Sequence, residues 1–377
     1  MKRMRFSPLH AVALSFALSV LGTNFSAAKE FKYATFTPPK SDVPRLAVPP
    51  FAKYVTEKTN GAITWRIFAG GSLLGARATL DGIRDGIADG GFIVPTFQIS
   101  ALPHVNLVPD LIAFAEDPVQ AAGAGNETHI LDCPECVEDY AKMNAINFGS
   151  FGTSSYWLQC AKPIAGLADL SNRKIRVTGS SAGRWVRALG ATPVAIPPTE
   201  IAPAMQRGQV DCAIAIPYWL RGFSLKDSVR HIIDDPQGSF HGHGIFVFNR
   251  KMWDGLTREQ KAIYLRGVAK GVANATIQGA LFDEPKVVDD AVKKQHIEIK
   301  HGDAEFKAAW AKHKAGEVAA VLAGAEKRGI KKEVAERVVK AHIANLEKWM
   351  EISKKVGKDK AKFEQALWDE IYSKVKY

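Results

Sequence analysis

The sequence predicts an α/β protein with two lobes, joined by a hinge, and a long helical region toward the C-terminus. The chain has 377 residues, which exceeds the roughly 250 to 300 residues at which a single hydrophobic core stops growing. Short apolar strands alternate with amphipathic helices in two successive runs, a pattern typical of largely parallel or mixed sheets. Helical periodicity then dominates from about residue 257 onward.

The composition is that of an ordinary globular protein, with 46% hydrophobic and 24% charged residues. It excludes a disordered or collagen-like chain. The net charge is +11, but near the C-terminus Lys alternates with Glu and Asp at helical spacing, as on a solvated helix face. We therefore expect no nucleic-acid partner, and the positive field favours small anionic ligands.

The first 28 residues have the pattern of a secretory signal peptide. Three basic residues among the first five precede an apolar run at about 11–21, and the small residues at 26–28 are typical of the cleavage region. The apolar run is shorter than the roughly 20 residues needed to cross a bilayer. We expect export and a mature chain that begins at about Lys29, with a short membrane anchor as the alternative.

The first lobe is predicted over residues 29–150. Alternating apolar residues predict strands at 31–36 and 63–68, and a short apolar run predicts another at 91–94. One helix is expected at 51–59, between two prolines and a glycine, and another at 76–87.

The second lobe is predicted over residues 151–240, and parts of 240–377 are expected to complete the first lobe. Extended segments are predicted at 145–151, 156–160, 174–177, 192–196 and 210–216, with helices at 182–189 and 200–206. Each of these helices is followed by a glycine, a common stop signal.

The region 250–377 is predicted to be mainly helical. Thr257 and Gln260 fit a capping box, and the helix behind them can run toward Lys294 as a long element that spans the hinge. A strand-like segment at 297–300 interrupts the helical pattern.

Cys133 and Cys136 are expected to form a structural disulfide. The four cysteines are an even number, and an exported protein folds in an oxidising compartment. Free thiols, a redox motif and half of a metal site are the alternatives, although no strand precedes Cys133 as a thioredoxin-type motif requires. The sequence leaves open whether Cys160 and Cys212 pair.

Two motifs suggest chemistry. The segment from Gly179 to Gly183 matches the G-x-S-x-G nucleophile elbow, with Ser181 as the nucleophile of a secreted α/β hydrolase. The preceding strand, however, alternates charged with apolar residues instead of being apolar on both faces. His241 and His243 could share one face of a strand and bind a metal, but no third ligand has suitable spacing. We therefore predict no catalytic residues, no metal and no cofactor.

Arg176 is the strongest candidate for ligand binding. It lies near the end of the predicted strand at 174–177, and ligands of α/β sheets bind at the carboxyl ends of strands. A guanidinium at this position can hold a carboxylate bidentately. Pairing with a surface acid is the alternative.

Several segments together resemble the extracytoplasmic solute receptors of TRAP (tripartite ATP-independent periplasmic) transporters, the DctP-type family. The resemblance rests on Lys162 to Leu170, Lys174 to Val177, Ala188 to Ala191, Pro193-Val194, Glu200, Gln209 to Asp211, Gly71 to Gly75 and Phe248 to Trp253. It implies a two-lobed periplasmic-binding-protein fold that closes on a small organic acid. It also implies a periplasmic binding protein without enzymatic activity, which delivers the acid to the membrane permease subunits of a TRAP transporter.

In this resemblance, Arg176 takes the position of the arginine that holds the ligand carboxylate. Tyr156 stands where many family members have a second arginine, and the pocket is therefore predicted to prefer an aromatic or branched monocarboxylate. The candidate ligand-binding residues are Arg176, Tyr156, Phe97, Ser180, Tyr218, Trp219, Phe240 and His241.

Overall fold

The structure, a computed structural model, describes residues 28–377. The predicted signal peptide at 1–28 lies outside the described residues, except for its last residue. Within the described part of the chain, no helix combines the length and the apolar character needed to cross a bilayer.

The first sheet has five strands in the order β2-β1-β3-β10-β4. The strands are β1 (Lys29–Ala34), β2 (Ile63–Phe68), β3 (Gly90–Ile93), β4 (Ala145–Asn147) and β10 (Gly244–Asn249). β1 is parallel to β2 and β3, whereas β10 is antiparallel to β3 and β4. The predicted strands at 31–36, 63–68 and 91–94 are confirmed within one or two residues. β4 is shorter than the predicted segment 145–151, although the Phe148 amide still donates to the Phe246 carbonyl of β10 at 3.0 Å.

The second sheet has six strands in the order β11-β9-β5-β8-β6-β7. The strands are β5 (Trp157–Cys160), β6 (Lys174–Val177), β7 (Thr192–Ala195), β8 (Cys212–Ala215), β9 (His231–Ile233) and β11 (Glu298–Lys300). β6 is parallel to β7 and β8. All of the strands predicted for this part of the chain are present. β9 is not among them.

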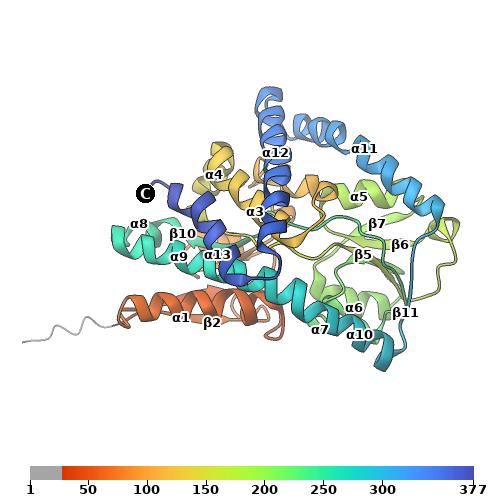
Figure 1. Ribbon diagram of the computed structural model, residues 1–377, viewed down its shortest axis with the longest axis horizontal. Helices are drawn as coiled ribbons and strands as arrows, with labels where there is room; N and C mark the ends of the chain where they lie inside the picture. The colour runs from red at the N-terminus through yellow and green to blue at the C-terminus, as the bar shows by residue number, and fades with distance from the viewer. Residues whose placement is uncertain (1–27) are drawn as a thin grey trace, which may run out of the picture.

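Helices surround both sheets (Figure 1). They are α1 (Val48–Lys58), α2 (Thr79–Arg84), α3 (Pro118–Glu127), α4 (Pro134–Lys142), α5 (Gly179–Ala188), α6 (Pro198–Gln206), α7 (Trp219–Gly222), α8 (Arg250–Asp254), α9 (Arg258–Asn274), α10 (Glu284–Gln295), α11 (Ala304–Lys327), α12 (Lys332–Val356) and α13 (Lys360–Glu370). α2 is shorter than the predicted helix at 76–87, because the chain turns at Gly86 with a φ of 75°, a common helix stop.

A long helical path connects the two lobes. The capping box of Thr257 and Gln260 is present at the start of α9, and α9 continues through the π-helical segment η8 (Ala275–Asp283) into α10. Figure 1 shows this path running from α1 and β2 of the first lobe to α6 and β11 of the second. The predicted long helix is therefore confirmed.

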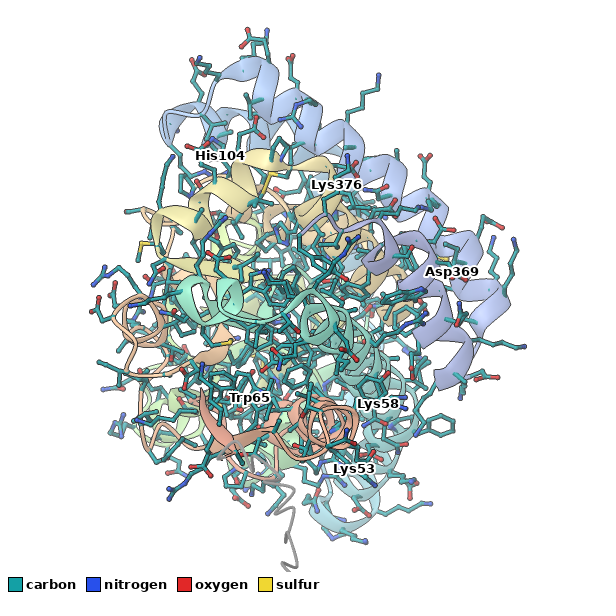
Figure 2. The ribbon with its side chains drawn as sticks, turned by 90° about the vertical axis from the view of Figure 1, so that its left-hand side faces the viewer. Lys53, Lys58, Trp65, His104, Asp369 and Lys376 are labelled. Atoms are coloured by element: carbon teal, nitrogen blue, oxygen red, sulfur yellow. A yellow bond between two sulfur atoms is a disulfide. The ribbon has the colours of Figure 1, made fainter. Side chains whose placement is uncertain are left out.

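Aromatic side chains fill the core of the first lobe. Phe51 of α1 packs against Phe246 of β10, with ring centroids 5.0 Å apart, and against Tyr264 of α9 at 5.5 Å. Trp65 of β2 joins them, whereas Lys53 lies on the exposed face of α1 (Figure 2). The amphipathic pattern of α1 thus fixes this helix on the sheet.

The segments that connect the two sheets lie side by side. Residues 148–156 lead from β4 to β5, and residues 234–243 lead from β9 to β10. We call them the crossing segments. They pair in antiparallel fashion at Ser155 and Ser239, and the Tyr156 amide donates to the Gly238 carbonyl at 2.9 Å. This pairing brings side chains from both connections to the space between the lobes.

Two disulfides are present among the described residues. Cys133 and Cys136 pair at the N-terminus of α4. Cys160 and Cys212 are direct neighbours on the antiparallel strands β5 and β8, and they also pair. The second disulfide therefore joins two strands of one sheet.

Candidate functional site

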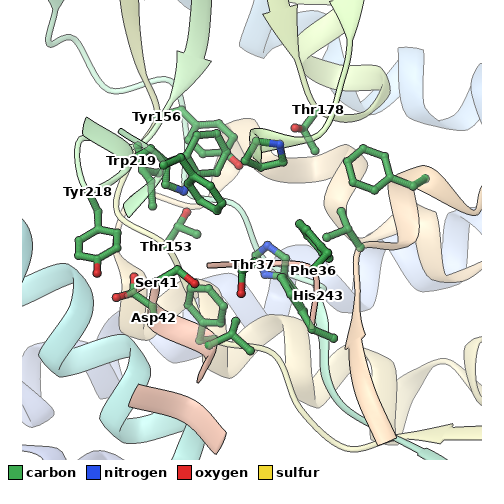
Figure 3. Close-up of a pocket in the computed structure, with 18 residues that line it drawn as sticks. Phe36, Thr37, Ser41, Asp42, Thr153, Tyr156, Thr178, Tyr218, Trp219 and His243 are labelled. Carbon is green, nitrogen blue, oxygen red and sulfur yellow. The ribbon is translucent and has the colours of Figure 1, made fainter. Parts of the chain in front are cut away.

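A cavity lies between the two lobes (Figure 3). It contains about 560 Å³ of empty space, part of which is open to solvent. Most of its lining is aromatic or aliphatic. The first lobe contributes Phe36, Thr37, Ser41, Asp42, Val43, Phe92, Val94 and Phe97, the second contributes Thr178, Pro198, Ile216, Tyr218, Trp219 and Phe223, and the crossing segments contribute Phe151, Thr153, Tyr156 and His243.

Arg176 of β6 lies behind this lining and is fully buried. Its Nε donates to the carbonyl of Ile196 at 3.0 Å, and its Nη1 donates to the carbonyl of Ile214 at 3.2 Å. Nη2 has no hydrogen-bond partner among residues 28–377. Burial lowers the pKa of Arg176 to about 10, so the side chain remains charged at neutral pH. The Nη2 group can therefore donate to an acceptor on a ligand.

Two aromatic residues stand between Arg176 and the cavity. The Trp219 ring centroid lies 5.0 Å from the Arg176 guanidinium carbon, and the Tyr156 ring lies 5.7 Å from that of Trp219. Burial raises the pKa of the Tyr156 phenol, although the positive charge of Arg176 opposes this effect. Tyr156 is therefore a neutral neighbour of the guanidinium.

His243 lies on the cavity wall among aromatic rings. Its imidazole is stacked on Phe151, with centroids 5.0 Å apart and an interplanar angle of 5°, and it contacts Phe240 at 4.4 Å. Burial lowers the pKa of His243 to about 3, against the weaker opposing effect of a hydrogen bond with the Phe151 backbone. The imidazole is therefore neutral at physiological pH.

Asp42 is the only carboxylic acid among the lining residues of the described chain. Burial raises its pKa to about 7, and the nearby positive charge of Arg45 opposes this shift. Arg45 Nη2 donates to Asp42 Oδ1 at 3.2 Å. No lysine or arginine lines the cavity within residues 28–377.

Tyr218 connects the two lobes at the edge of the cavity. Its hydroxyl donates to the carbonyl of Lys40, in the first lobe, at 2.7 Å, and accepts from Arg45 Nη2 at 3.3 Å. The Tyr218 amide donates to Glu284 Oε2 at 3.0 Å. Closed lobes thus share a polar contact beside the aromatic lining.

The structure brings four of the eight candidate residues to the cavity wall: Tyr156, Phe97, Tyr218 and Trp219. Arg176 does not line the cavity but lies beside Trp219 and Tyr156. Ser180, Phe240 and His241 do not line the cavity. Ser180 lies in the first turn of α5, and Phe240 supports Tyr156 and His243 from behind.

The sequence suggested that His241 and His243 share one face of a strand, and the structure shows that they do not. β10 begins only at Gly244, and Gly242 between the two histidines has a φ of 79°, which turns the chain. The His241 imidazole is buried and its Nε2 lies 2.8 Å from Nε2 of His342 in α12, away from the cavity wall. His243 is the histidine that lines the cavity.

The position of Ser181 argues against a hydrolase. Ser181 lies in the first turn of α5, and the positive φ of 80° falls on Gly179, two residues before it, instead of on the serine. The Ser181 hydroxyl is buried and donates to Glu317 Oε2 at 2.6 Å, and Arg184 neutralises this carboxylate. Within residues 28–377, no histidine is bonded to Ser181, in contrast to a Ser-His-Asp triad.

Several lining residues were missed by reasoning from the sequence. Phe36, Val94, Thr178 and Ile216 each come one or two residues after a strand of the two sheets. The rule that predicted Arg176, that ligands bind at the carboxyl ends of strands, would have found them if applied to every strand. Asp42 has no comparable signal, because it does not follow a strand: it is the N-cap residue of the π-helical segment Val43–Ala47, which leads into α1.

Comparison with known proteins identifies a matching family. The family described as "Bacterial extracellular solute-binding protein, family 7" matches residues 33–323, most of the chain. A C4-dicarboxylate-binding periplasmic protein from Rhodobacter capsulatus is 24% identical over 324 residues, which cover 80% of this chain and 88% of that protein.

A monocarboxylate 2-oxoacid-binding periplasmic protein from a Nostoc species is 28% identical over 182 residues, which cover 46% of this chain and 47% of that protein. The matches to the first three curated relatives span 47%, 63% and 62% of their lengths, less than two thirds of each.

Solved structures share the fold. A TRAP periplasmic solute binding protein from Bordetella bronchiseptica with bound (R)- and (S)-mandelate has a TM-score of 0.70 and 21% identity, and the match covers 85% of this chain and 99% of that one. A TRAP solute binding protein from Rhodoferax ferrireducens in complex with copurified benzoate has a TM-score of 0.75 and 18% identity, over 86% of this chain and 100% of that one. The predicted two-lobed α/β fold is therefore confirmed.

Proposed function

Because the chain belongs to family 7 of the bacterial extracellular solute-binding proteins, the non-enzymatic receptors of TRAP transporters, we propose that it binds a small monocarboxylic acid between its lobes. The acid is aromatic or branched, and Arg176 holds its carboxylate. The receptor delivers the acid from the periplasm to the permease subunits of a TRAP transporter.

The observation that carries this proposal is the unpartnered Nη2 of Arg176 behind an aromatic cavity. A buried charge without a partner is costly, and a carboxylate supplies both the missing acceptor and the countercharge. Charge-assisted bonds of this kind are about twice as strong as neutral ones. Nη2 is itself buried, so opening of the lobes and movement of Trp219 give the carboxylate its path.

The charges of the cavity favour a monocarboxylate. Among the lining residues that the structure describes, a second carboxylate would meet neutral His243 and the carboxyl group of Asp42, but no lysine or arginine. An unpaired buried carboxylate costs several kcal/mol. The aromatic walls instead stabilise an apolar body, at about 25 cal/mol for each Å² of apolar surface buried.

The ligands of the similar proteins support part of this proposal. The mandelate and benzoate of the two solved structures are aromatic monocarboxylates. The Rhodobacter capsulatus relative, a C4-dicarboxylate-binding protein, supports the carboxylate but not the choice of a monocarboxylate.

A thermal-shift screen followed by calorimetry tests the proposal. Benzoate, phenylacetate and 3-methylbutanoate are compared with succinate and malate at equal concentration. A ligand at 100 times its dissociation constant adds about 2.7 kcal/mol to the free energy of unfolding. We expect the monocarboxylates to raise the melting temperature more, and a C4-dicarboxylate as the tightest ligand would contradict the proposal.

A further inference from the structure

Polar side-chain atoms on the cavity wall differ in whether the protein already satisfies them. The hydroxyl groups of Thr37, Ser41 and Thr153 are paired with Thr35, the Pro38 carbonyl and the Ser154 carbonyl, at 2.7 to 2.8 Å. Among the buried polar atoms of the lining within residues 28–377, Thr178 Oγ1 and His243 Nδ1 have no partner.

These two atoms belong to different ends of the cavity. Thr178 follows Arg176 by two residues and belongs to the end proposed for the carboxylate. His243 comes from the crossing segment that leads into β10. Figure 3 shows the two side chains on opposite walls, with the imidazole of His243 extending toward the open middle.

The surroundings of His243 make the unpaired state of its Nδ1 atom unusual. Phe151, Phe240 and Phe92 surround the ring with centroids 5.0, 4.4 and 5.6 Å away, and the side chain is 6% exposed. These rings fix the orientation of the imidazole, and its Nδ1 atom has no hydrogen-bond partner within residues 28–377. A buried polar group without a partner costs free energy, and a ligand that bonds to it recovers that cost.

We propose that His243 is a specificity-determining residue that binds a hydroxyl group on the acid, so that the ligand is a hydroxy-substituted monocarboxylate. This inference rests on the proposed function. A neutral imidazole has one N–H donor and one acceptor nitrogen, and a hydroxyl group can pair with either. A second carboxylate can only accept, and it would bring an uncompensated charge next to Asp42.

The test compares pairs of acids that differ by one hydroxyl group. Calorimetry measures the affinities of phenylacetate against mandelate and of benzoate against 3- and 4-hydroxybenzoate. Because a recovered hydrogen bond changes affinity by about tenfold, we expect the native protein to prefer one hydroxy acid by about that factor. His243→Phe should reduce this ratio to about one and keep the affinity for the unsubstituted acid within about threefold.

Two further variants make the result specific. His301→Phe, the same substitution at a surface histidine that is 82% exposed, should leave the ratio unchanged. His243→Gln keeps a donor and an acceptor and should retain part of the preference, which separates hydrogen bonding from shape. It also provides a test if His243→Phe does not fold.

The outcomes separate this inference from the proposed function. The role of His243 is overturned if His243→Phe leaves the ratio of the two affinities unchanged, or if the native protein does not prefer a hydroxy acid. In either case, binding of the unsubstituted acids still supports the carboxylate site at Arg176. If Arg176→Ala no longer binds either acid of a pair, this result supports the carboxylate site at Arg176 but says nothing about His243. If no monocarboxylate binds the native protein, the proposed function fails and this inference fails with it.

Discussion

The guanidinium of Arg176 lies over the indole of Trp219, with 5.0 Å between the guanidinium carbon and the ring centroid. A cation over an aromatic face is stabilised by the ring quadrupole. The indole therefore offsets part of the cost of a buried positive charge that has no carboxylate beside it. Trp219 also lines the cavity, so a ligand that approaches Arg176 must contact or displace it.

Arg176→Ala should abolish binding of the carboxylate ligand, with a loss of affinity of about 100-fold or more, because a charge-assisted pair is removed. Arg176→Lys should recover little, since a lysine cannot bridge two carbonyls and a carboxylate in the same planar geometry. Calorimetry measures the affinities, and the melting temperature without ligand reports the loss of the bonds to Ile196 and Ile214. Unchanged affinity in the alanine variant would remove Arg176 from the site.

Tyr156→Arg should increase the affinity for C4-dicarboxylates relative to monocarboxylates. The variant places a second cation where Tyr156 now stands beside Arg176, and it can neutralise the second carboxylate of succinate or malate. Tyr156→Phe is the control, because it removes only the hydroxyl and should leave this preference as it is. A succinate affinity that does not improve in the arginine variant would contradict our interpretation of the pocket.

Both disulfides should be found in unreduced peptides by mass spectrometry. In the chain-entropy account, a longer closed loop gives more stabilisation. Cys160 and Cys212 are 52 residues apart, whereas Cys133 and Cys136 are 3 apart. Replacing the Cys160–Cys212 pair by alanines should therefore lower the free energy of unfolding by about 2 kcal/mol more than replacing the other pair. Free thiols at Cys133 and Cys136 would refute the smaller bridge.

Compared with the native protein, the Glu284→Gln variant should gain more stability at pH 8 than at pH 5. Burial raises the pKa of Glu284 from 4.5 to about 8, although hydrogen bonds from Ser154 and from the Tyr218 amide oppose the shift. The folded state then binds a proton that the unfolded state has released. The stability contributed by this proton is present below pH 4.5 and is lost as the pH rises toward 8.

Thermal unfolding at pH 5 to 8 checks this expectation. The difference in melting temperature between Glu284→Gln and the native protein should grow with pH. Glu347→Gln, at an exposed position of α12, is the matched control and should show no such trend. A difference that is constant across this range would show that Glu284 is ionised with an ordinary pKa.

The sequence predicts the fold better than the site, for identifiable physical reasons. Alternating runs such as residues 63–68 and 174–177 show which face of each strand is buried, so the sheets could be expected. A strand end also predicted the place of Arg176. That Arg176 is fully buried depends on the carbonyls of Ile196 and Ile214 and on Trp219, which come from three other parts of the chain.

The histidines illustrate the limit of local patterns. A spacing of two residues places His241 and His243 on one face only if the backbone between them is extended, and the positive φ of Gly242 breaks this condition. Asp42 and Tyr218 likewise meet through contacts between the lobes. Such contacts depend on how the lobes close, which no short segment specifies.

The place of β10 between β3 and β4 in the first sheet determines when this lobe can fold during synthesis. The strand ends at Asn249, so a ribosome must add about two thirds of the chain before β3 and β4 have the strand that lies between them. β11 imposes a similar delay on the other sheet. Pairing between strands that lie far apart in the sequence is slow to form, so we expect both sheets to be completed late in folding.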